Sequence, residues 1–398
     1  MSTVIAVFSI ALGISPVARA QTPEPTRRGV IEEEQAEKAK DLHPYMLTAT
    51  ERALNKLEDI TVNGVMRWHP YFEGGYNGAG FTLGVGYMHH VSPYNLLDVR
   101  GSYSIKGYKR VEAEFIAPRM FQRRAELSVL GGWREATQVA FYGVGTNTPA
   151  ENRVNYSFRQ PYVSGLMTYW PTRKFLMLRG GAEITQYTQN PGEGSFPSIE
   201  TVYTPQTLPG LGAEVQYWHT QGTVGFDSRP APAYARRGGF YGVTLHNYID
   251  PDALLGFREV DYEALHHFPI LREAWTISLR GRVQTTHTKE GQAIPFFLLP
   301  SLGGGHNLRG YESYRFRDND SLLMQAEWRI MVNRFIDTAF FFDTGTVASR
   351  TRDLGFDDLT SDFGFGVRFH SPFATMLRIE VAKSPEGYKL VFASSSPF

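Results

Sequence analysis

Residues 275–284 have the sequence Trp-Thr-Ile-Ser-Leu-Arg-Gly-Arg-Val-Gln, in which apolar and polar side chains alternate almost without exception. Residues 324–330, Met-Gln-Ala-Glu-Trp-Arg-Ile, alternate in the same way. A period of two is typical of a β-strand with one buried face, because successive side chains point to opposite sides of the backbone. The same pattern recurs in residues 97–103, 259–264 and 377–383. The chain is therefore predicted to be all-β.

The polar face of these strands decides the class of β protein. Each strand offers one apolar face, while the other carries charges such as Arg280, Arg282, Glu327 and Arg329. No helices are expected that would cover a sheet of this size. A closed antiparallel barrel in a membrane solves this, because the apolar face contacts lipid and closure leaves no unpaired strand edge. The prediction is a transmembrane β-barrel with a charged, watery lumen, and a soluble two-sheet sandwich is the open alternative.

About 16 strands are predicted, with lengths that suit the roughly 9–11 residues of a tilted membrane strand. They cover residues 79–90, 95–105, 108–118, 123–133, 137–144, 152–170, 174–188, 211–228, 238–248, 256–268, 272–286, 321–332, 335–345, 361–370, 374–383 and 387–394. Residues 63–73 are either an extra strand or a lead-in. The longest connection, residues 287–320, contains Gly303-Gly304-Gly305. Loops of that length usually carry function.

The composition excludes several classes of protein. The chain has 398 residues, with 40 Lys plus Arg, 40 Asp plus Glu and no Cys. A net charge of zero gives no electrostatic basis for nucleic-acid binding. The lack of Cys excludes disulfides, thiolate metal sites and cysteine nucleophiles. Beyond the N-terminus no apolar run approaches the roughly 20 residues of a membrane helix. No nucleic-acid partner and no cofactor are expected.

The N-terminus is predicted to be an export signal. The apolar run at residues 4–14 precedes Ala18-Arg19-Ala20, which fits an A-x-A cleavage site, and a buried helix is the alternative. The residues that follow are expected to form a short periplasmic segment, partly helical, with Thr48 or Thr50 as the cap of its second helix. Three regions are thus expected: a signal peptide (1–20), the periplasmic segment (21–60) and the barrel (61–398).

No catalytic constellation is found, so an enzyme is not expected. His89-His90 and His266-His267 cannot chelate a metal from one strand face, because adjacent residues point to opposite faces. The glycines at 303–305 lack the Lys-Ser/Thr of a phosphate loop. No G-x-S-x-G elbow of a patatin-type lipase occurs, and Phe369-His370-Ser371 does not supply a lipase triad.

Four motifs follow one another in the second half of the chain. They are Asp227-Ser228-Arg229 with Tyr234 and Arg237-Gly238-Gly239 after it, Leu308-Arg309-Gly310-Tyr311, Phe341-Phe342-Asp343-Thr344-Gly345, and Gly364-Phe365-Gly366-Val367-Arg368. The second motif lies in the long connection, and the last two lie on the second and third of the five strands expected after it. This order resembles the C-terminal barrel of the BamA/TamA superfamily, also called the bacterial surface antigen family. The resemblance covers residues 210–398 by motif and 61–398 by architecture.

The resemblance implies how the long connection folds. In the family the sixth extracellular loop turns back into the lumen, and its Arg pairs with the inward acidic residue of the F-x-D-x-G motif. Here that implies contact between Arg309 and Asp343, with Glu327 and Arg368 near by on the lumen wall. Loop six would then act as a latch that tunes barrel opening. Charges that simply line a wet pore are the alternative.

The last predicted strand resembles the C-terminal signal by which outer-membrane barrels are recognised during assembly. Its pattern consists of Gly387, the apolar Leu390 and Phe392, and the final residue Phe398. An ordinary amphipathic strand after a Pro-Glu-Gly turn is the alternative.

The resemblance also implies a place and a function. The place is the outer membrane of a Gram-negative-type envelope. Family members with POTRA domains use them to add a strand to a client polypeptide, but residues 21–60 leave no room for such a domain, so a short barrel-only member is expected. The first function is assistance in the insertion or translocation of protein or lipid. The partners would be the bilayer and, as candidates, unfolded outer-membrane proteins, a separate periplasmic partner or lipids. A passive porin-like channel and a structural surface protein are the alternatives.

Overall fold

The structure is a computed structural model, and it describes residues 27–41, 48–49, 51–53, 55–56, 67–72, 76–172, 175–371 and 373–398. The expected signal peptide lies outside these residues. The chain divides into two compact units, residues 1–52 and 53–398. In the described part of the chain, no helix combines the length and the apolar character needed to cross a membrane.

The first unit contains the charged helix α1 (Arg27–Asp41). On its exposed face the Arg28 Nε donates to Glu32 Oε1 at 3.0 Å, a pair one helical turn apart. Further along, the Glu51 backbone N–H donates to Thr48 Oγ1 at 3.2 Å, and the Thr48 N–H donates to the Glu51 carboxylate at 2.9 Å. This reciprocal pair is a capping box. Thr48 is therefore the cap of a helical turn at this point.

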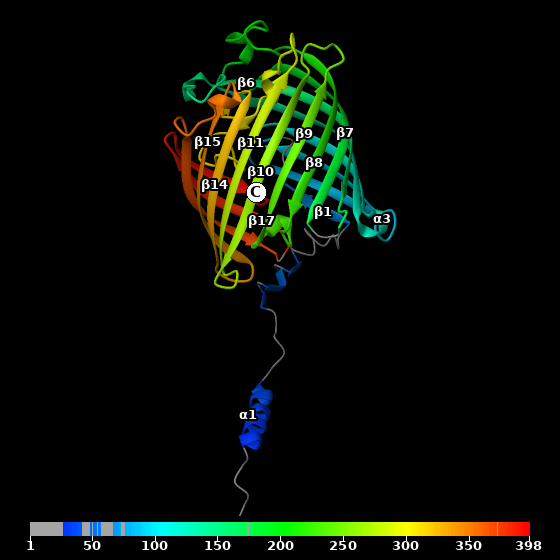
Figure 1. Cartoon of the computed structure of the whole chain (residues 1–398), viewed down its shortest axis with the longest axis vertical. Helices are drawn as coiled ribbons and strands as arrows, with labels where there is room; N and C mark the ends of the chain where they lie inside the picture. The colour runs from blue at the N-terminus through cyan, green and yellow to red at the C-terminus, as the bar shows by residue number, and fades with distance from the viewer. Residues whose placement is uncertain are drawn as a thin grey trace, which may run out of the picture. The chain divides into compact units, whose positions relative to one another are not determined.

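The second unit is a 16-stranded antiparallel meander in which each strand pairs with its neighbours in chain order. Its strands are β1 (Trp68–Tyr71), β2 (Thr82–His90), β3 (Leu96–Ser104), β4 (Lys109–Arg119), β5 (Ala125–Phe141), β6 (Val154–Tyr169), β7 (Leu176–Pro191), β8 (Glu214–Asp227), β9 (Gly238–Ile249), β10 (Phe257–Ile270), β11 (Trp275–Thr288), β14 (Asp320–Met331), β15 (Ile336–Ala348), β16 (Thr360–His370), β17 (Thr375–Ser384) and β18 (Gly387–Ala393). Figure 1 shows the strands tilted and rolled into a barrel. Among the described residues no strand pair joins β18 to β1. We call the junction of these two end strands the seam.

Short helices and a small hairpin lie in the connections. They are α3 (Met120–Arg123), η1 (Ala150–Asn152), η2 (Ile199–Thr201), η3 (Pro232–Tyr234), η4 (Phe296–Leu298) and η5 (Thr351–Asp353), with β12 (Ser301–Leu302) paired to β13 (Phe316–Arg317). The longest connection, residues 289–319 between β11 and β14, is the sixth on its side of the barrel and is called loop six below. Residues 228–237, between β8 and β9, lie at the opposite end and are called the periplasmic turn.

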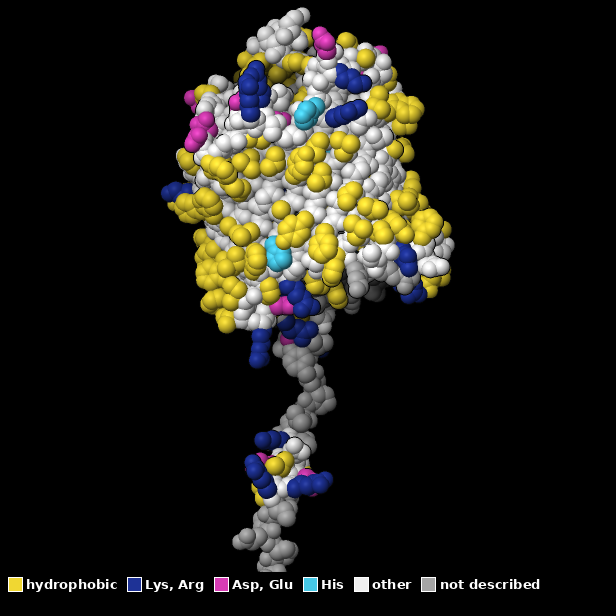
Figure 2. Space-filling view, in the orientation of Figure 1, with side chains coloured by type: hydrophobic (Ala, Val, Ile, Leu, Met, Phe, Trp, Pro, Cys, Tyr) yellow, Lys and Arg dark blue, Asp and Glu magenta, His cyan; other side chains and the backbone are white. Residues whose placement is uncertain are grey.

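The alternating sequence places apolar side chains on the outside of the barrel. On β15, Phe340 and Phe342 are 48% and 47% exposed, whereas Phe341 and Asp343 between and beside them are buried. Figure 2 shows many hydrophobic side chains over the barrel wall in view. Because this surface faces lipid in a membrane barrel, its exposure is the arrangement that a transmembrane barrel requires. The prediction of an all-β antiparallel barrel is confirmed.

The strand count agrees with the prediction, but two errors offset each other. The predicted strands 123–133 and 137–144 are one strand, β5, with a bulge between Ala136 and Val139. The extra residue of a bulge interrupts the period of two without ending the strand, which is why the sequence suggests a turn there. The additional strand is β1, which lies within residues 63–73.

The lumen is not uniformly watery, so that part of the prediction is wrong. Inward aromatic residues of the strands from β5 to β10 pack with residues of the extracellular loops, including loop six. The members of this apolar cluster are Ala79, Tyr108, Ala136, Val139, Phe141, Val154, Tyr156, Phe158, Tyr187, Ile199, Leu208, Leu211, Val215, Tyr217, Phe257, Ile294, Phe296 and Phe297. At its centre the Phe296 ring lies edge-on to Phe141 at 5.3 Å and to Tyr156 at 4.8 Å between centroids, a favourable geometry for aromatic pairs.

Candidate functional site

The tip of loop six reverses direction through its glycines. Gly303 has a φ of +110°, and a Cβ there would lie 2.2 Å from the Glu312 carbonyl oxygen, so only glycine fits. The Gly304 N–H donates to the carbonyl oxygens of Leu308 and Tyr311 at 3.1 and 3.2 Å. The tip is thus a compact turn.

Two side chains of the tip anchor it to the barrel wall. Leu308 and Tyr311 are buried in a second apolar group, whose other members are Leu302, Phe316, Leu323 and Val347. Leu323 and Val347 belong to β14 and β15, so the tip packs on the inner face of these strands. The Tyr311 hydroxyl also donates to the Ser361 carbonyl oxygen of β16 at 3.3 Å.

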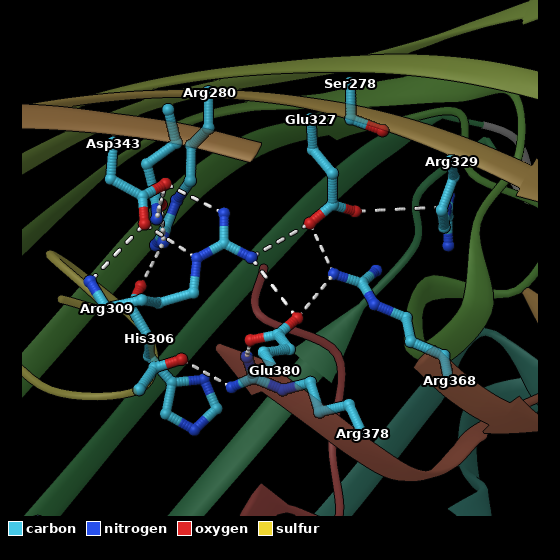
Figure 3. A network of polar contacts seen from close by, with 12 residues as sticks. Ser278, Arg280, His306, Arg309, Glu327, Arg329, Asp343, Arg368, Arg378 and Glu380 are labelled. Atoms are coloured by element: carbon cyan, nitrogen blue, oxygen red, sulfur yellow. Dashed lines mark hydrogen bonds and ion pairs between the residues drawn. The ribbon is translucent and has the colours of Figure 1, made fainter. Parts of the chain in front are cut away.

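Arg309 projects from this turn into a fully buried ionic site (Figure 3). Its Nε and Nη2 donate to the two carboxylate oxygens of Asp343 at 2.7 and 2.8 Å. This two-pronged geometry is the strongest form of an arginine–carboxylate pair. The guanidinium also lies 3.5 Å above the Phe341 ring centroid. The structure therefore brings together the Arg of the loop tip and the Asp and first Phe of the F-x-D-x-G motif.

Further carboxylates and guanidinium groups surround that pair. Arg309 Nη1 lies 3.0 Å from Glu327 Oε2 and 3.4 Å from Glu380 Oε1. Arg368 contacts both of these glutamates through Nη2, at 3.1 Å in the case of Glu380. Arg378 Nη1 closes the group at 2.5 Å from Glu380 Oε2. We call these six residues, Arg309, Glu327, Asp343, Arg368, Arg378 and Glu380, the latch network.

The sequence pointed to Glu327 and Arg368 but missed Arg378 and Glu380. Both missed residues lie on β17, on the inward face that the alternation of residues 377–383 defines. Glu380 pairs in register with Gly366, and Ile379 with Val367, so the alternation on β16 and β17 was the available signal. Which inward charge would reach Arg309 depended on the register.

The glycines of the barrel motifs leave room for the latch. A Cβ on Gly345 would lie 2.9 Å from Leu302 of loop six, and one on Gly364 would lie 2.5 Å from the Phe341 ring. A Cβ on Gly366 would lie 2.5 Å from Glu380 Cγ. In the loop, Gly310 approaches Asp362 so closely that a Cβ would lie 2.6 Å from Asp362 Cβ. These contacts give each motif glycine a steric reason.

Loop six is also tied to β18, one of the two strands of the seam. Lys389 of β18 donates to the Tyr311 carbonyl oxygen and lies 3.6 Å from Glu312. Arg315 Nε donates to Glu386, in the turn before β18, at 2.7 Å. The position of the loop is therefore coupled by direct contacts to the last strand.

The predicted C-terminal signal is divided between two faces. Leu390 and Phe392 are 55% and 61% exposed on the outside of β18, and Gly387 opens the strand with a φ of +127°. Phe398 does not continue this outward row, and its part in an assembly signal stays a prediction. Beyond β18 the tail turns inward: Arg378 Nε donates to the Ser395 carbonyl oxygen at 2.9 Å. The Phe398 ring lies 6.1 Å from that of the buried His267.

A second buried polar site, which the sequence missed, joins the periplasmic turn to the far wall. The Tyr234 hydroxyl donates to Asp337 Oδ2 at 2.6 Å and lies 2.9 Å from His370 Nε2. Arg236 Nη2 lies 2.6 Å from Asp337 Oδ1. The Tyr234 ring stacks on His370 at 4.0 Å. The turn thus reaches from β8 and β9 to the first residues of β15 and the last of β16.

Both sites consist of buried ion pairs and hydrogen bonds that attach a connection to the barrel wall. Within the described ranges, no group of three or more His, Asp or Glu residues is arranged to hold a metal ion. A buried charge needs a partner, and removing one partner leaves the other uncompensated. Both sites therefore fix a connection in the lumen through paired charges.

Comparison with known proteins gives a family match and a fold match. Residues 76–389 match the model of the Omp85 superfamily domain. The structure of BamA from Haemophilus ducreyi lacking POTRA domains 1-3 is similar with a TM-score of 0.60 and 15% identity, over 82% of this chain and 70% of that chain. CdiB from Escherichia coli gives a TM-score of 0.56 and 10% identity, over 82% of this chain and 61% of that chain. None of the curated proteins matched the sequence.

Because the sequence identities are low, the two structural likenesses establish the fold and nothing more. The family match spans most of the chain and agrees with the resemblance drawn from the four motifs. This chain belongs to the Omp85 superfamily and is an outer-membrane β-barrel protein.

Proposed function

We propose that this barrel assists the insertion or translocation of protein or lipid at the outer membrane, with loop six as a latch. The observation that carries the proposal is the fully buried contact of Arg309 with Asp343, Glu327 and Glu380. Burying such charges is costly, and well-packed apolar residues would hold a loop at least as firmly. An ionic latch is useful where the loop has to be released.

The contacts of loop six with β18 connect the latch to the seam. Lys389 and Glu386 both bond to residues of the loop just after its tip. In the proposed mechanism, the latched loop holds β18 in place at the seam, and release frees this strand to move away from its latched position. The open edge and the locally thinned bilayer would then admit a client chain or lipid. No catalytic step is required.

A passive channel is the second candidate. Charged inward residues such as Asp261 and Arg282, which pair at 2.5 Å, are consistent with a wet passage along part of the wall. The apolar cluster around Phe296 argues against free passage on the extracellular side. A structural surface protein is the third candidate, and it requires neither conduction nor latch release.

The test is the folding of an unfolded outer-membrane protein into liposomes that contain the full chain. The variants are Arg309→Ala, Arg309→Lys and, as a matched control, Arg352→Ala, whose side chain is 72% exposed and contacts only its neighbour Asp353 among the described residues. The proposal expects the wild type and Arg352→Ala to accelerate client folding relative to empty vesicles. Arg309→Ala should lose most of this acceleration. Equal client folding in empty and protein-containing vesicles would refute the proposal, and ion conductance measured on the same vesicles would then test the channel.

A further inference from the structure

Arg329 of β14 lies between the latch network and the periplasmic turn. It is almost fully buried, with 2% of its surface exposed. Its Nη2 donates to the carbonyl oxygen of Ala235 in the turn. Its Nε faces Glu327 Oε1 at 4.0 Å, and this contact is drawn in Figure 3. One side chain thus contacts the periplasmic turn directly and lies beside Glu327, the wall residue that pairs with Arg309 of loop six.

The two atoms that face each other at 4.0 Å are buried, and within the described residues neither has a hydrogen-bond partner. The other carboxylate oxygen of Glu327 is shared by Arg309 and Arg368. Glu327 is therefore held by the latch on one side and only loosely approached by Arg329 on the other. If Arg309 leaves, Glu327 loses a cation. Arg368 still bonds to its Oε2, and the Nε of Arg329 is the unpaired donor that faces its unpaired Oε1.

A move of Arg329 toward Glu327 would weaken the hold on the turn. The turn is also held by Asp337, which accepts from Tyr234 at 2.6 Å and contacts Arg236 at 2.6 Å. Further bonds join it to His370, Glu273 and Thr375. Asp337 pairs in register with Arg368, another member of the latch network. Arg329 and Asp337, two of the attachments of the turn, therefore lie next to groups whose charge balance depends on Arg309.

We propose that Arg329 is a positioning residue that couples loop six to the periplasmic turn, so that release of the latch also releases the turn. This inference rests on the proposed latch role of loop six and adds its regulation: the two ends of the lumen open together. A coupling free energy between two sites works in both directions. Loosening the turn would therefore also weaken the hold on loop six.

The chain has no Cys, which allows a direct measurement of turn exposure. The Ala235 side chain is 4% exposed, whereas Ala233 in the same turn is exposed. Ala235→Cys reports release of the turn through its rate of reaction with a water-soluble maleimide, and Ala233→Cys reports the rate of a freely accessible thiol. Ala235→Cys keeps the backbone carbonyl that Arg329 binds. All measurements use the full chain folded in liposomes, with folding verified by circular dichroism.

The expected result is slow labelling of Ala235→Cys that Arg309→Ala accelerates by roughly 5- to 150-fold, the usual range for coupled sites. Arg352→Ala should leave the rate unchanged. In an Arg329→Lys background, which keeps the charge but cannot bond to the turn and Glu327 together, the ratio of rates with and without Arg309→Ala should fall to about one. The Asp337 contacts still hold the turn there, so the rate stays below that of Ala233→Cys.

Two results would overturn the coupling: an Ala235→Cys rate that Arg309→Ala leaves unchanged, or an acceleration that Arg329→Lys does not reduce. Client folding in the same liposomes separates this outcome from failure of the proposed function. Client folding that depends on Arg309 with an unresponsive turn refutes the coupling alone. A responsive turn in vesicles that give no client acceleration refutes the proposed function and leaves the coupling in place.

Discussion

Loop six is held in the lumen at two places, by apolar packing near its start and by apolar packing together with buried ion pairs at its tip. Near its start, Phe296 and Phe297 pack into the apolar cluster on the inner face of β5 to β10. Near its tip, Arg309 is held by carboxylates of β14, β15 and β17. Apolar packing is non-directional and scales with the buried area, whereas an arginine–carboxylate pair is directional. We infer that the first place gives the loop stability and the second a defined state that can be released.

The largest effect on stability is expected from a change in the apolar cluster around Phe296. Phe296→Ala should lower the free energy of unfolding by about 3–5 kcal/mol, because it leaves a cavity among Phe141, Tyr156 and Phe297. The measurement is the urea midpoint of the barrel in lipid, with Phe356→Ala, 72% exposed in the next extracellular connection, as the control. If the two variants unfold at the same urea concentration, the apolar cluster does not stabilise the fold as described.

A smaller effect on stability is expected from a change in the latch network around Arg309. Asp343→Asn should cost about 1–3 kcal/mol, because a neutral amide replaces the carboxylate while Arg309 keeps Glu327 and Glu380. Unlike Phe296→Ala, it should also make loop six more accessible to added protease. Protease digestion and urea unfolding on both variants test the contrast. If Asp343→Asn and Phe296→Ala gave the same stability and the same protease sensitivity, the latch network and the apolar cluster would not differ in their role.

The polar site of the periplasmic turn is expected to contribute less to stability than the latch network. Tyr234→Phe removes a hydroxyl that bonds to Asp337 and His370, while the ring can still stack on His370. We expect a loss of about 0.5–1.5 kcal/mol, the net value of one hydrogen bond. Its effect should appear mainly as faster labelling of Ala235→Cys. A loss as large as that of Phe296→Ala would mean that the turn is part of the stability core.

The smallest effect is expected from an ion pair at the barrel rim. Lys109 Nζ lies 2.7 Å from Glu135, but the Lys109 side chain is 48% exposed. Lys109→Ala should change stability by about 0–1 kcal/mol, and less at high salt, because water and ions screen exposed pairs. Urea unfolding at low and high salt measures this. A salt-independent cost equal to that of Asp343→Asn would show that burial is not what distinguishes the latch network.

Much of the candidate site was predictable from residue order. The glycines and the Arg at the tip of loop six, and the Asp of β15, belong to motifs that the sequence displays, and the structure places Arg309 on Asp343. Glu380 and its partner Arg378 were not predicted, because the contact of Glu380 with Arg309 depends on how β16 and β17 are aligned. The periplasmic turn was missed because Tyr234 and Asp337 are 103 residues apart.

The class of fold could be read from the amino-acid sequence, because the period of two follows from backbone geometry within each strand and needs no distant partner. The same pattern shows which face of each strand meets lipid, while a function for the long glycine-containing loop stays a prediction. Which inward side chains meet across the lumen could be seen only in the folded barrel. Those contacts depend on strand register, on the bulge in β5 and on how the loops fold back. The apolar cluster, the inward C-terminal tail and the link through Arg329 are all contacts between segments far apart in the chain, which local patterns do not specify.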